Sequence, residues 1–287
     1  MSCDSLGSGP AGDEIAHASA PTLASTAAGA TCPPQLADDC LILAGPTAAG
    51  KTAIALPLAK RLGAEIVSVD SMAVYRTLDI GTAKPSAAEQ QQIPHHAIDL
   101  VEPSELFSVA AWLNEAGRAV DRIRARGRRV LFVGGTPLYL KALREGLSAG
   151  PAADPALREA LALRLDREGA PALHRELAAL DPEAAARIHP NDSRRIIRGI
   201  EVATGTPASR DRQGSSWGRS STHACGAALL VVDVPRKLLN ERIAARVQTM
   251  FSAGLVDEVR AAEANGGIGP TARQAAGYSE VLAMLAG

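Results

Sequence analysis

The residues from Gly45 to Thr52 match the pattern G-x-x-x-x-G-K-[ST], in which backbone N–H groups surround a phosphate. Glycines permit the tight turn, the helix that begins here adds about half a positive charge at its N-terminus, and Lys51 adds a full charge. The Thr52 hydroxyl is the expected magnesium ligand. The motif predicts a phosphate-binding loop but no particular reaction; its residues are Gly45, Pro46, Thr47, Ala48, Ala49, Gly50, Lys51 and Thr52.

Asp70 follows the next apolar run, at the edge where α/β sheets bind their ligands. A carboxylate at this place could hold magnesium or accept a proton from a nucleophile. It could also cap a helix beginning at Ser71. The spacing leaves these three roles open.

The third candidate is Gly134-Gly135-Thr136, which ends another apolar run. Two glycines let the backbone approach a ligand closely, and the Thr136 hydroxyl can donate or accept a hydrogen bond. A plain turn between a strand and a helix would have the same composition.

Two stretches rich in basic residues are candidates for contact with a polyanion. The first, from Arg118 to Arg144, contains eight Lys and Arg residues. In the second, Arg194, Arg195 and Arg198 fall on about one helical turn and could hold phosphodiester oxygens. A solvated helix face explains the first stretch equally well, and a surface helix tied by ion pairs explains the second equally well.

A parallel sheet is needed to bring these residues together. Short apolar runs predict strands at 40–44, 65–69, 129–133 and 227–234, with a further short strand at 97–100. Between and after them, the sequence favours the helices 53–62, 108–126, 237–251, 255–264 and 271–285. This alternation predicts an α/β fold of the P-loop type, with helices on both faces of a parallel sheet.

The composition divides the chain into four predicted parts. Residues 1–38 form an acidic, Ala/Ser/Thr/Gly/Pro-rich tail expected to be disordered, and 39–150 form the first part of the core. Residues 151–224 have helical composition interrupted by prolines, which indicates a small helical insertion. Residues 225–287 return to the strand pattern and complete the core.

Charge, hydrophobic runs and cysteine content indicate which classes of protein this sequence does not resemble. The net charge of the chain is −1, but residues 1–40 hold five acids and no Lys or Arg, so the remainder has 30 basic and 26 acidic residues. No apolar stretch approaches the roughly 20 residues of a membrane helix, and no secretion signal is recognisable. The four cysteines form no CxxC pair, which favours free thiols in a reducing compartment and a cytoplasmic location.

Taken together, the sequence closely resembles the tRNA dimethylallyltransferases from Cys40 to Gly287. Each block stands in the order and spacing of that family. The blocks are LAGPTAAGKT, EIVSVDSMAVYRTLDIGTAKP, PHHAIDLVEP, VLFVGGTPLYLKAL, AARIHPNDSRRIIRGIEV and RQAAGYSE.

The resemblance implies transfer of a dimethylallyl group from dimethylallyl diphosphate to N6 of adenosine 37, the adenine beside the tRNA anticodon. The phosphate loop would hold the diphosphate leaving group rather than ATP as a phosphoryl donor, with Lys51, Thr52 and Mg²⁺ stabilising its charge. Asp70 matches the family carboxylate that takes a proton from the attacking amine. Thr136 matches the threonine that bonds near the same amine.

The resemblance also implies contacts with tRNA, for which the adenine must leave the anticodon stack. The helical insertion matches the accessory domain that embraces the anticodon arm, and a monomer is expected. The residues that align with RNA-contacting segments are Asp70, Ser71, Met72, Ala73, Thr136, Arg158, Arg194, Arg195, Ile196, Ile197, Arg198, Gln274, Ala275, Ala276, Gly277, Tyr278 and Ser279.

One departure from the family pattern keeps other functions open. Family members continue past the GY-containing helix through a basic segment of the form T-R-x-x-A-K-R-Q-x-T-W-x-R, whereas this sequence stops at Gly287. Its absence would weaken RNA affinity and stability. The alternatives are prenylation of a free adenine nucleotide, as in the adenylate isopentenyltransferases, and a remnant that binds tRNA without chemistry.

Overall fold

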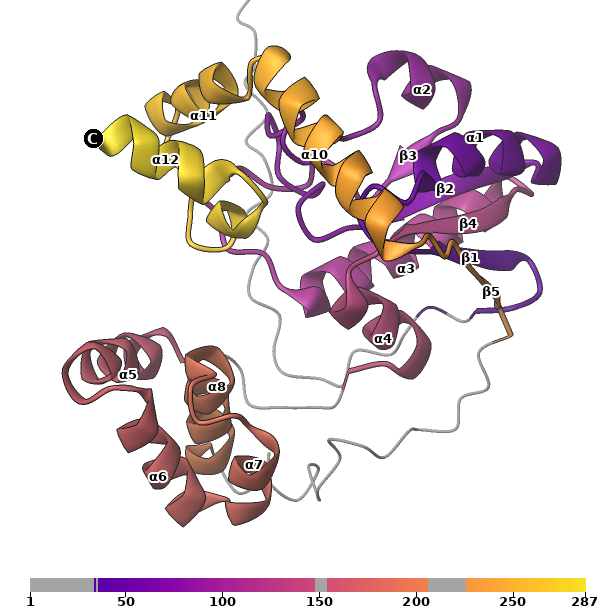
Figure 1. The fold of residues 1–287 in the computed structure, drawn as a ribbon. Helices are drawn as coiled ribbons and strands as arrows, with labels where there is room; N and C mark the ends of the chain where they lie inside the picture. The colour runs from indigo at the N-terminus through magenta and orange to yellow at the C-terminus, as the bar shows by residue number, and fades with distance from the viewer. Residues whose placement is uncertain (1–33, 35, 148–153, 206–225) are drawn as a thin grey trace, which may run out of the picture.

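The computed structural model describes residue 34 and residues 36–147, 154–205 and 226–287. In this part of the chain, one parallel sheet has the strand order β3-β2-β4-β1-β5 (Figure 1). The predicted parallel sheet is therefore confirmed. Its strands are β1 (Cys40–Ala44), β2 (Ala64–Val69), β3 (His95–His96), β4 (Arg129–Gly134) and β5 (Ala228–Val231).

The register of the strands brings the candidate residues to one edge. Gly134, the last residue of β4, pairs with Ala44 at the end of β1 and with Val69 at the end of β2. The chain therefore leaves three neighbouring strands at the same level. Gly45, Asp70 and Gly135 are the first residues beyond that level, so parallel pairing alone places them together.

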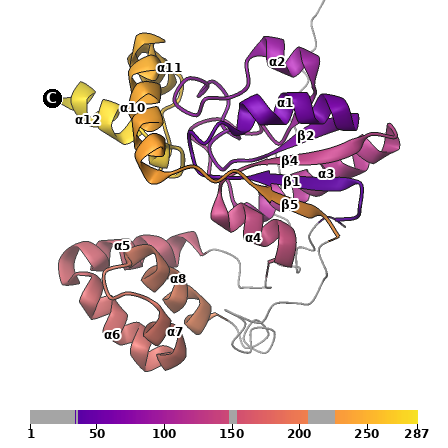
Figure 2. The same cartoon turned by 45° about the vertical axis from the view of Figure 1, so that its right-hand side comes forward.

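Helices cover both faces of the sheet, as Figures 1 and 2 show. One face packs in a core with Trp112, Leu143 and Val259, whereas the other packs mainly on Ala55 and Ala59 of α1. The predicted fold class is confirmed. The helices of this unit are α1 (Lys51–Leu62), α2 (Ala87–Gln92), α3 (Val109–Ala125), α4 (Pro137–Glu145), α10 (Arg236–Ser252), α11 (Leu255–Ala264), the 3₁₀ turn η1 (Ala272–Gln274) and α12 (Tyr278–Ala286).

Four helices between β4 and β5 form a bundle with its own apolar core. Leu161, Leu173 and Ile200 are fully buried among them. Aspartate side chains cap three of these helices, each accepting a hydrogen bond from a backbone N–H of the first turn. The bundle consists of α5 (Pro155–Glu168), α6 (Ala170–Leu180), α7 (Pro182–Arg187) and α8 (Ser193–Thr204).

Two local predictions were wrong. The strand predicted at 97–100 is absent because Ala97 and Asp99 have φ values of 58° and 52°, and the short strand β3 ends just before them. The helix predicted at 271–285 is divided, since Gly277 has a φ of 94° between η1 and α12. Residues 71–74 form bends and turns, so the open alternative in which Asp70 caps a helix beginning at Ser71 does not hold. The predicted tail lies largely outside the described residues.

Candidate active site at the carboxyl edge of the sheet

The Gly45–Thr52 loop connects β1 to α1 and turns through two left-handed residues, Ala48 at φ 63° and Gly50 at φ 91°. The Lys51 ammonium reaches back over the loop and donates to the carbonyls of Gly45 at 2.9 Å and Pro46 at 2.8 Å. Burial lowers the pKa of Lys51, and the nearby Asp70 carboxylate partly opposes this effect. The loop thus holds a desolvated positive charge at the start of a helix.

The two glycines at the end of β4, Gly134 and Gly135, are both required because the backbones of neighbouring segments approach closely there. A Cβ atom on Gly134 would lie 2.1 Å from the Val69 carbonyl oxygen, and one on Gly135 would lie 2.4 Å from the Gly45 carbonyl oxygen. No side chain fits at either distance. The Gly134-Gly135 pair therefore packs the ends of β2, β4 and β1 together, which a plain turn does not require.

Asp70 and Thr136 lie on adjacent strand ends and share a small polar network. Asp70 Oδ1 accepts hydrogen bonds from the backbone N–H groups of Met72 at 2.8 Å and Ala73 at 3.3 Å. Thr136 Oγ1 accepts from the Ser71 N–H at 3.1 Å and donates to Ser71 Oγ at 3.4 Å. Within the described residues, Asp70 Oδ2 has no hydrogen-bond partner, so one carboxylate oxygen is available for a substrate.

Two arginines of α10 approach this edge, and they were not among the predicted site residues. Arg242 Nη1 donates to the Ala49 carbonyl in the phosphate loop at 3.4 Å. Arg246, one helical turn later, is half-buried, and this burial lowers its pKa while Asp70 opposes the shift. The i, i+4 spacing puts both arginines on one face of α10, but the sequence does not show that this face meets the loop.

A cleft with a cavity volume of about 100 Å³ opens between α1, β2 and the loop after Asp70. Its lining includes both polar and apolar side chains. The polar residues are Lys51, Thr52, Ser68, Asp70, Thr82, Lys84 and His95, and the apolar ones include Ala55, Leu56, Ile66, Ile98 and Val133. This lining matches a ligand that has both a charged part and a short apolar part.

Comparisons with known proteins agree with the geometry. A family model described as IPP transferase matches residues 73–287, and one described as isopentenyl transferase matches residues 39–99. The chain belongs to the IPP transferase family. The family resemblance found in the sequence is thereby confirmed, and so is the class of enzyme, a transferase of isopentenyl groups.

Individual relatives in the family extend this result. A tRNA dimethylallyltransferase of Anaeromyxobacter dehalogenans is 48% identical over 247 residues, covering 86% of this chain and 82% of the relative. One from Methylibium petroleiphilum is 50% identical over 251 residues, covering 86% and 77%.

Solved structures of the family have the same fold. The tRNA isopentenylpyrophosphate transferase of Bacillus halodurans matches with a TM-score of 0.56 at 39% identity, covering 86% of this chain and 77% of that one. A eukaryotic dimethylallyltransferase acting on tRNA matches with a TM-score of 0.66 at 26% identity, covering 86% and 63%.

The residues predicted from the family pattern to contact RNA fall into two groups. Arg195 on α8 extends its side chain, 66% exposed, and pairs only loosely with Asp192 at 3.4 Å. Arg158 and Arg198, by contrast, both bond to the buried Glu201 carboxylate, at 2.6 Å and 3.2 Å; the Arg158 pair joins α5 to α8, whereas the Arg198 pair lies within α8. The Arg195 guanidinium is therefore the most accessible of these charges.

The other predicted RNA-contacting residues have mixed exposure. Arg194 donates to Gln274 Oε1 at 2.6 Å, a contact between the helical bundle and η1. Ile196, Ala275 and Tyr278 are buried, so their side chains serve packing. The remaining predicted residues are half-buried Ser71, Met72, Thr136, Ile197 and Gly277, buried Ala73, and exposed Ala276 and Ser279.

The described residues show no group of three or more His, Cys, Asp or Glu side chains that could hold a metal ion. They also contain no helix of the length and apolarity that crossing a membrane demands. Any metal at the site would therefore depend on few protein oxygens, of which the Thr52 hydroxyl and the Asp70 carboxylate both line the cleft.

Proposed function

We propose that this chain transfers a dimethylallyl group from dimethylallyl diphosphate to N6 of the adenosine next to the tRNA anticodon. The amine nitrogen forms a bond to the allylic carbon, the C–O bond breaks, and its electron pair leaves with the diphosphate. One observation supports the proposal above the others: the desolvated Lys51 loop and the Asp70 carboxylate share one edge and one cleft.

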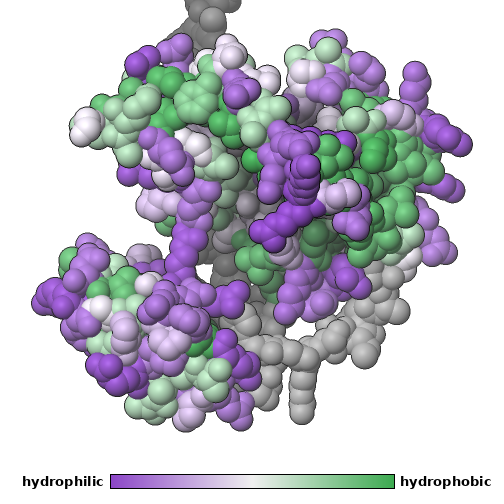
Figure 3. Space-filling model, viewed as in Figure 1, coloured by the Kyte–Doolittle hydropathy of each residue, from purple (hydrophilic) through white to green (hydrophobic). Residues whose placement is uncertain are grey.

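The diphosphate end of the substrate fits the cationic side of the cleft. Lys51, Arg242 and Arg246 would share its negative charge, because all three lie at the phosphate loop and none forms an ion pair within the described residues. Figure 3 shows hydrophilic residues gathered along α10, the helix that carries the two arginines. These charges stabilise the leaving group more as the C–O bond breaks.

Magnesium fits this part of the site. Thr52 would supply one oxygen ligand, and few protein ligands are typical of Mg²⁺ that is bound together with substrate phosphates. When bound, the ion would neutralise part of the developing charge on the diphosphate.

The adenine end fits Asp70 and its neighbours. Asp70 Oδ1 is held by two backbone N–H groups, so the carboxylate is fixed while Oδ2 is available to take the proton that N6 loses. The lone pair of N6 is delocalised into the ring, so removing its proton in the transition state contributes about 10²- to 10⁴-fold. Thr136 would bond to the same amine, and the apolar wall would enclose the five-carbon group and exclude water.

Recognition of tRNA is assigned to the helical bundle and the end of the chain. Arg195 is exposed on α8, and Arg194 lies at the contact with η1, so both can face a nucleic acid placed between the two parts. The proposal includes a monomer acting in the cytoplasm.

The test is a transfer reaction with two acceptors. Purified protein is incubated with dimethylallyl diphosphate, Mg²⁺ and either unmodified tRNA or AMP, and mass spectrometry follows addition of the five-carbon group. We expect the addition on tRNA, at the adenosine beside the anticodon, and its loss when Asp70→Asn replaces the wild type. Addition to AMP alone would establish the free-nucleotide activity instead, and no addition to either acceptor would refute the proposal.

A further inference from the structure

Glu258, in the first turn of α11, makes an unusual set of contacts with the loop that follows Asp70. Its Oε2 accepts hydrogen bonds from the N–H groups of Asp79 and Ile80, each at 2.7 Å. Its Oε1 accepts from the Gly81 N–H at 3.2 Å and from the Tyr278 hydroxyl at 2.6 Å. One carboxylate thus holds three successive backbone donors, which fixes the position of that turn.

Tyr278 completes the support from the other side. Its side chain is fully buried, and a Cβ atom on Gly81 would lie 2.4 Å from the ring, so the glycine backbone packs directly against the hydroxyl end of the tyrosine side chain. Burial and the Glu258 carboxylate raise the pKa of Tyr278, which keeps the hydroxyl protonated as a donor. The turn is therefore held by residues from α11 and α12.

The residues that follow this turn form part of the cleft wall. Thr82, Ala83, Lys84 and Pro85 line the same cavity as Lys51 and Asp70. The Lys84 side chain is 2% exposed, so this part of the wall is tightly packed.

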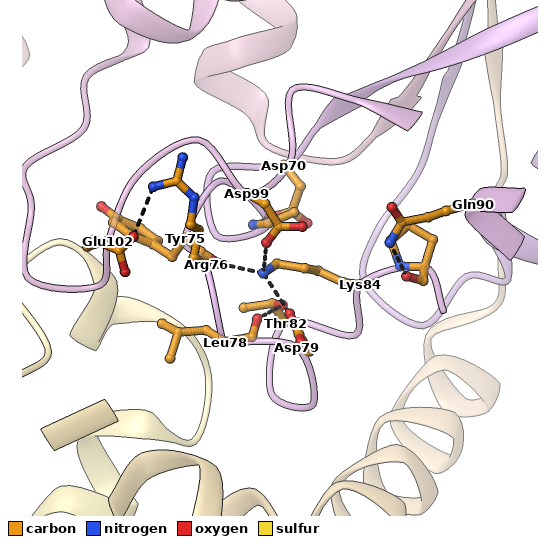
Figure 4. Close-up of polar contacts among 12 residues, drawn as sticks. Asp70, Tyr75, Arg76, Leu78, Asp79, Thr82, Lys84, Gln90, Asp99 and Glu102 are labelled. Atoms are coloured by element: carbon orange, nitrogen blue, oxygen red, sulfur yellow. Dashed lines mark hydrogen bonds and ion pairs between the residues drawn. The ribbon is translucent and has the colours of Figure 1, made fainter. Parts of the chain in front are cut away.

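Figure 4 shows how the loop is tied to itself. The Lys84 ammonium lies between the Asp79 carboxylate at 2.7 Å and the Asp99 carboxylate at 2.5 Å, and it also bonds to the Tyr75 carbonyl. These bonds stay within the loop and its neighbouring segment. Glu258 instead connects the loop to α11, so its hydrogen bonds fix the position of the loop relative to that helix.

We propose that Glu258 is a positioning residue for the prenyl transfer: it holds the Asp79–Gly81 turn, and through it the Thr82–Pro85 wall, against the bound allylic diphosphate. This inference rests on the proposed function. The residue touches no reacting atom. Its effect is geometric, because a displacement of about 1 Å in a wall that orients a substrate can cost about 10²-fold in rate.

The first readout is local and needs no activity. Hydrogen exchange is followed by mass spectrometry on a peptide spanning residues 78–84 in the full-length wild type and in Glu258→Gln. The variant keeps the size of the side chain, but its amide cannot accept from all four donors. We expect the amides of Asp79, Ile80 and Gly81 to exchange at least about tenfold faster, with peptides of β1 and β4 unchanged.

The second readout separates positioning from loss of folded protein. We expect Glu258→Gln to raise the KM for dimethylallyl diphosphate about tenfold while the KM for tRNA stays within about twofold, because the exposed Arg195 that is predicted to contact tRNA lies on α8 of the helical bundle. A role confined to stability would reduce the amount of active enzyme and leave both KM values unchanged. Binding of an unreactive thiolo analogue of the diphosphate, measured by calorimetry, should weaken by the same factor.

Two further variants complete the design. Asp257→Asn is the matched control: Asp257 is the preceding residue, its side chain is 81% exposed, and among the described residues that side chain pairs only with Arg260. Tyr278→Phe removes one of the four donors and should shift exchange and KM in the same direction by a smaller factor, which keeps the test valid if Glu258→Gln fails to fold.

The outcomes are distinguishable. A wild type that binds the analogue and transfers the group, together with a folded Glu258→Gln that matches it in exchange and in both KM values, would overturn the role of Glu258. If Glu258→Gln does not fold, a Tyr278→Phe variant indistinguishable from wild type would do the same. A wild type that neither binds the analogue nor transfers the group refutes the proposed function itself.

Discussion

The basic side chains at the carboxyl ends of the strands and those at the amino ends differ in whether they form ion pairs with carboxylates. At the carboxyl ends, Lys51, Arg242 and Arg246 contact backbone carbonyls or face Asp70 without forming an ion pair among the described residues. At the amino ends, Arg124 and Arg126 are each paired with a carboxylate. Since the residue types are the same, their partners decide which end can bind an anion.

The amino-end pairs are well formed. Arg124 donates to both carboxylate oxygens of Asp39, at 2.7 and 2.8 Å, and Arg126 donates to both oxygens of Glu65, at 3.0 and 2.6 Å. These bonds hold the pKa of Asp39 and of Glu65 below their usual values. These two arginines of the basic stretch that begins at Arg118 therefore stabilise the fold.

At the carboxyl ends of the strands, Lys51 and Arg246 are less well stabilised in their charged forms than the paired arginines at the amino ends. Burial lowers the pKa of Lys51 and of Arg246, which means that the surroundings disfavour their charged forms. A diphosphate in the cleft would stabilise the charged forms of Lys51 and Arg246, and this stabilisation would strengthen its binding. The difference between the two ends can be tested by substitution, beginning with the residue that should matter most.

Asp70→Asn should lower kcat for prenyl transfer by about 10²- to 10⁴-fold, because the amide cannot take up the proton from N6. Binding of tRNA should change little, since the amide keeps the size of the side chain. Steady-state kinetics and a tRNA filter-binding assay measure the two effects. Equal losses in rate and in tRNA binding would contradict the role as proton acceptor.

Lys51→Ala should weaken binding of dimethylallyl diphosphate by about 10- to 100-fold, the range for losing a hydrogen bond to a charged group. The control is Lys60→Ala, an exposed lysine in the last turn of the same helix. Calorimetry with the unreactive thiolo analogue compares the two variants. An unchanged dissociation constant for Lys51→Ala would remove the phosphate-loop assignment.

Arg246→Gln and Arg126→Gln test the comparison directly, because the same substitution is made at both ends. We expect Arg246→Gln to weaken diphosphate binding about tenfold and Arg126→Gln to leave it unaltered. The difference should shrink as salt is raised, since the lost contribution is partly Coulombic. Similar losses in both variants would mean that the charges act through the overall field rather than through contact.

The sequence predicted the strand, turn and helix around Gly45–Thr52 well because the motif specifies local shape. Lys51 is defined by its neighbours within eight residues, and the strand and helix around the loop follow from apolar patterning. The arginines of α10 could not be assigned in the same way. Their spacing shows that Arg242 and Arg246 share a helix face, but only the tertiary packing shows that this face meets the loop.

Errors occurred where the backbone departs from regular dihedral angles. Ala97 and Asp99 look like strand residues in an apolar context, yet both have positive φ, which composition does not reveal. The break at Gly277 lies inside an Ala-rich stretch of helical character. The role of Glu258 was equally hidden, because its partners at Asp79–Gly81 are far away in the sequence and are backbone groups.

Arg195→Ala should weaken tRNA binding by a few fold and reduce the slope of log affinity against log salt by about 1, as expected for one phosphate contact. Arg158→Ala is the comparison, because that arginine is bonded to Glu201 and should act mainly on stability. Binding measured at several salt concentrations gives the slopes. An unaltered slope for Arg195→Ala would show that this guanidinium does not lie at a phosphate.

Arg126→Gln should lower stability by no more than a few degrees in melting temperature, and the loss should depend on pH. Arg126 holds the pKa of Glu65 below about 4.5, its ordinary value, against the opposing effect of burial, and His96 contributes further lowering. A carboxylate with a lowered pKa in the folded state stabilises the fold above its unfolded pKa, and this contribution disappears as pH falls through the folded value. The stability gap between wild type and Arg126→Gln should therefore be fully present at pH values above about 4.5 and close as pH falls through the lowered pKa of Glu65, as measured by urea denaturation. A gap that stays constant with pH would mean that Arg126 acts through packing of its side chain, and the contrast between the two ends of the sheet would then not be one of charge.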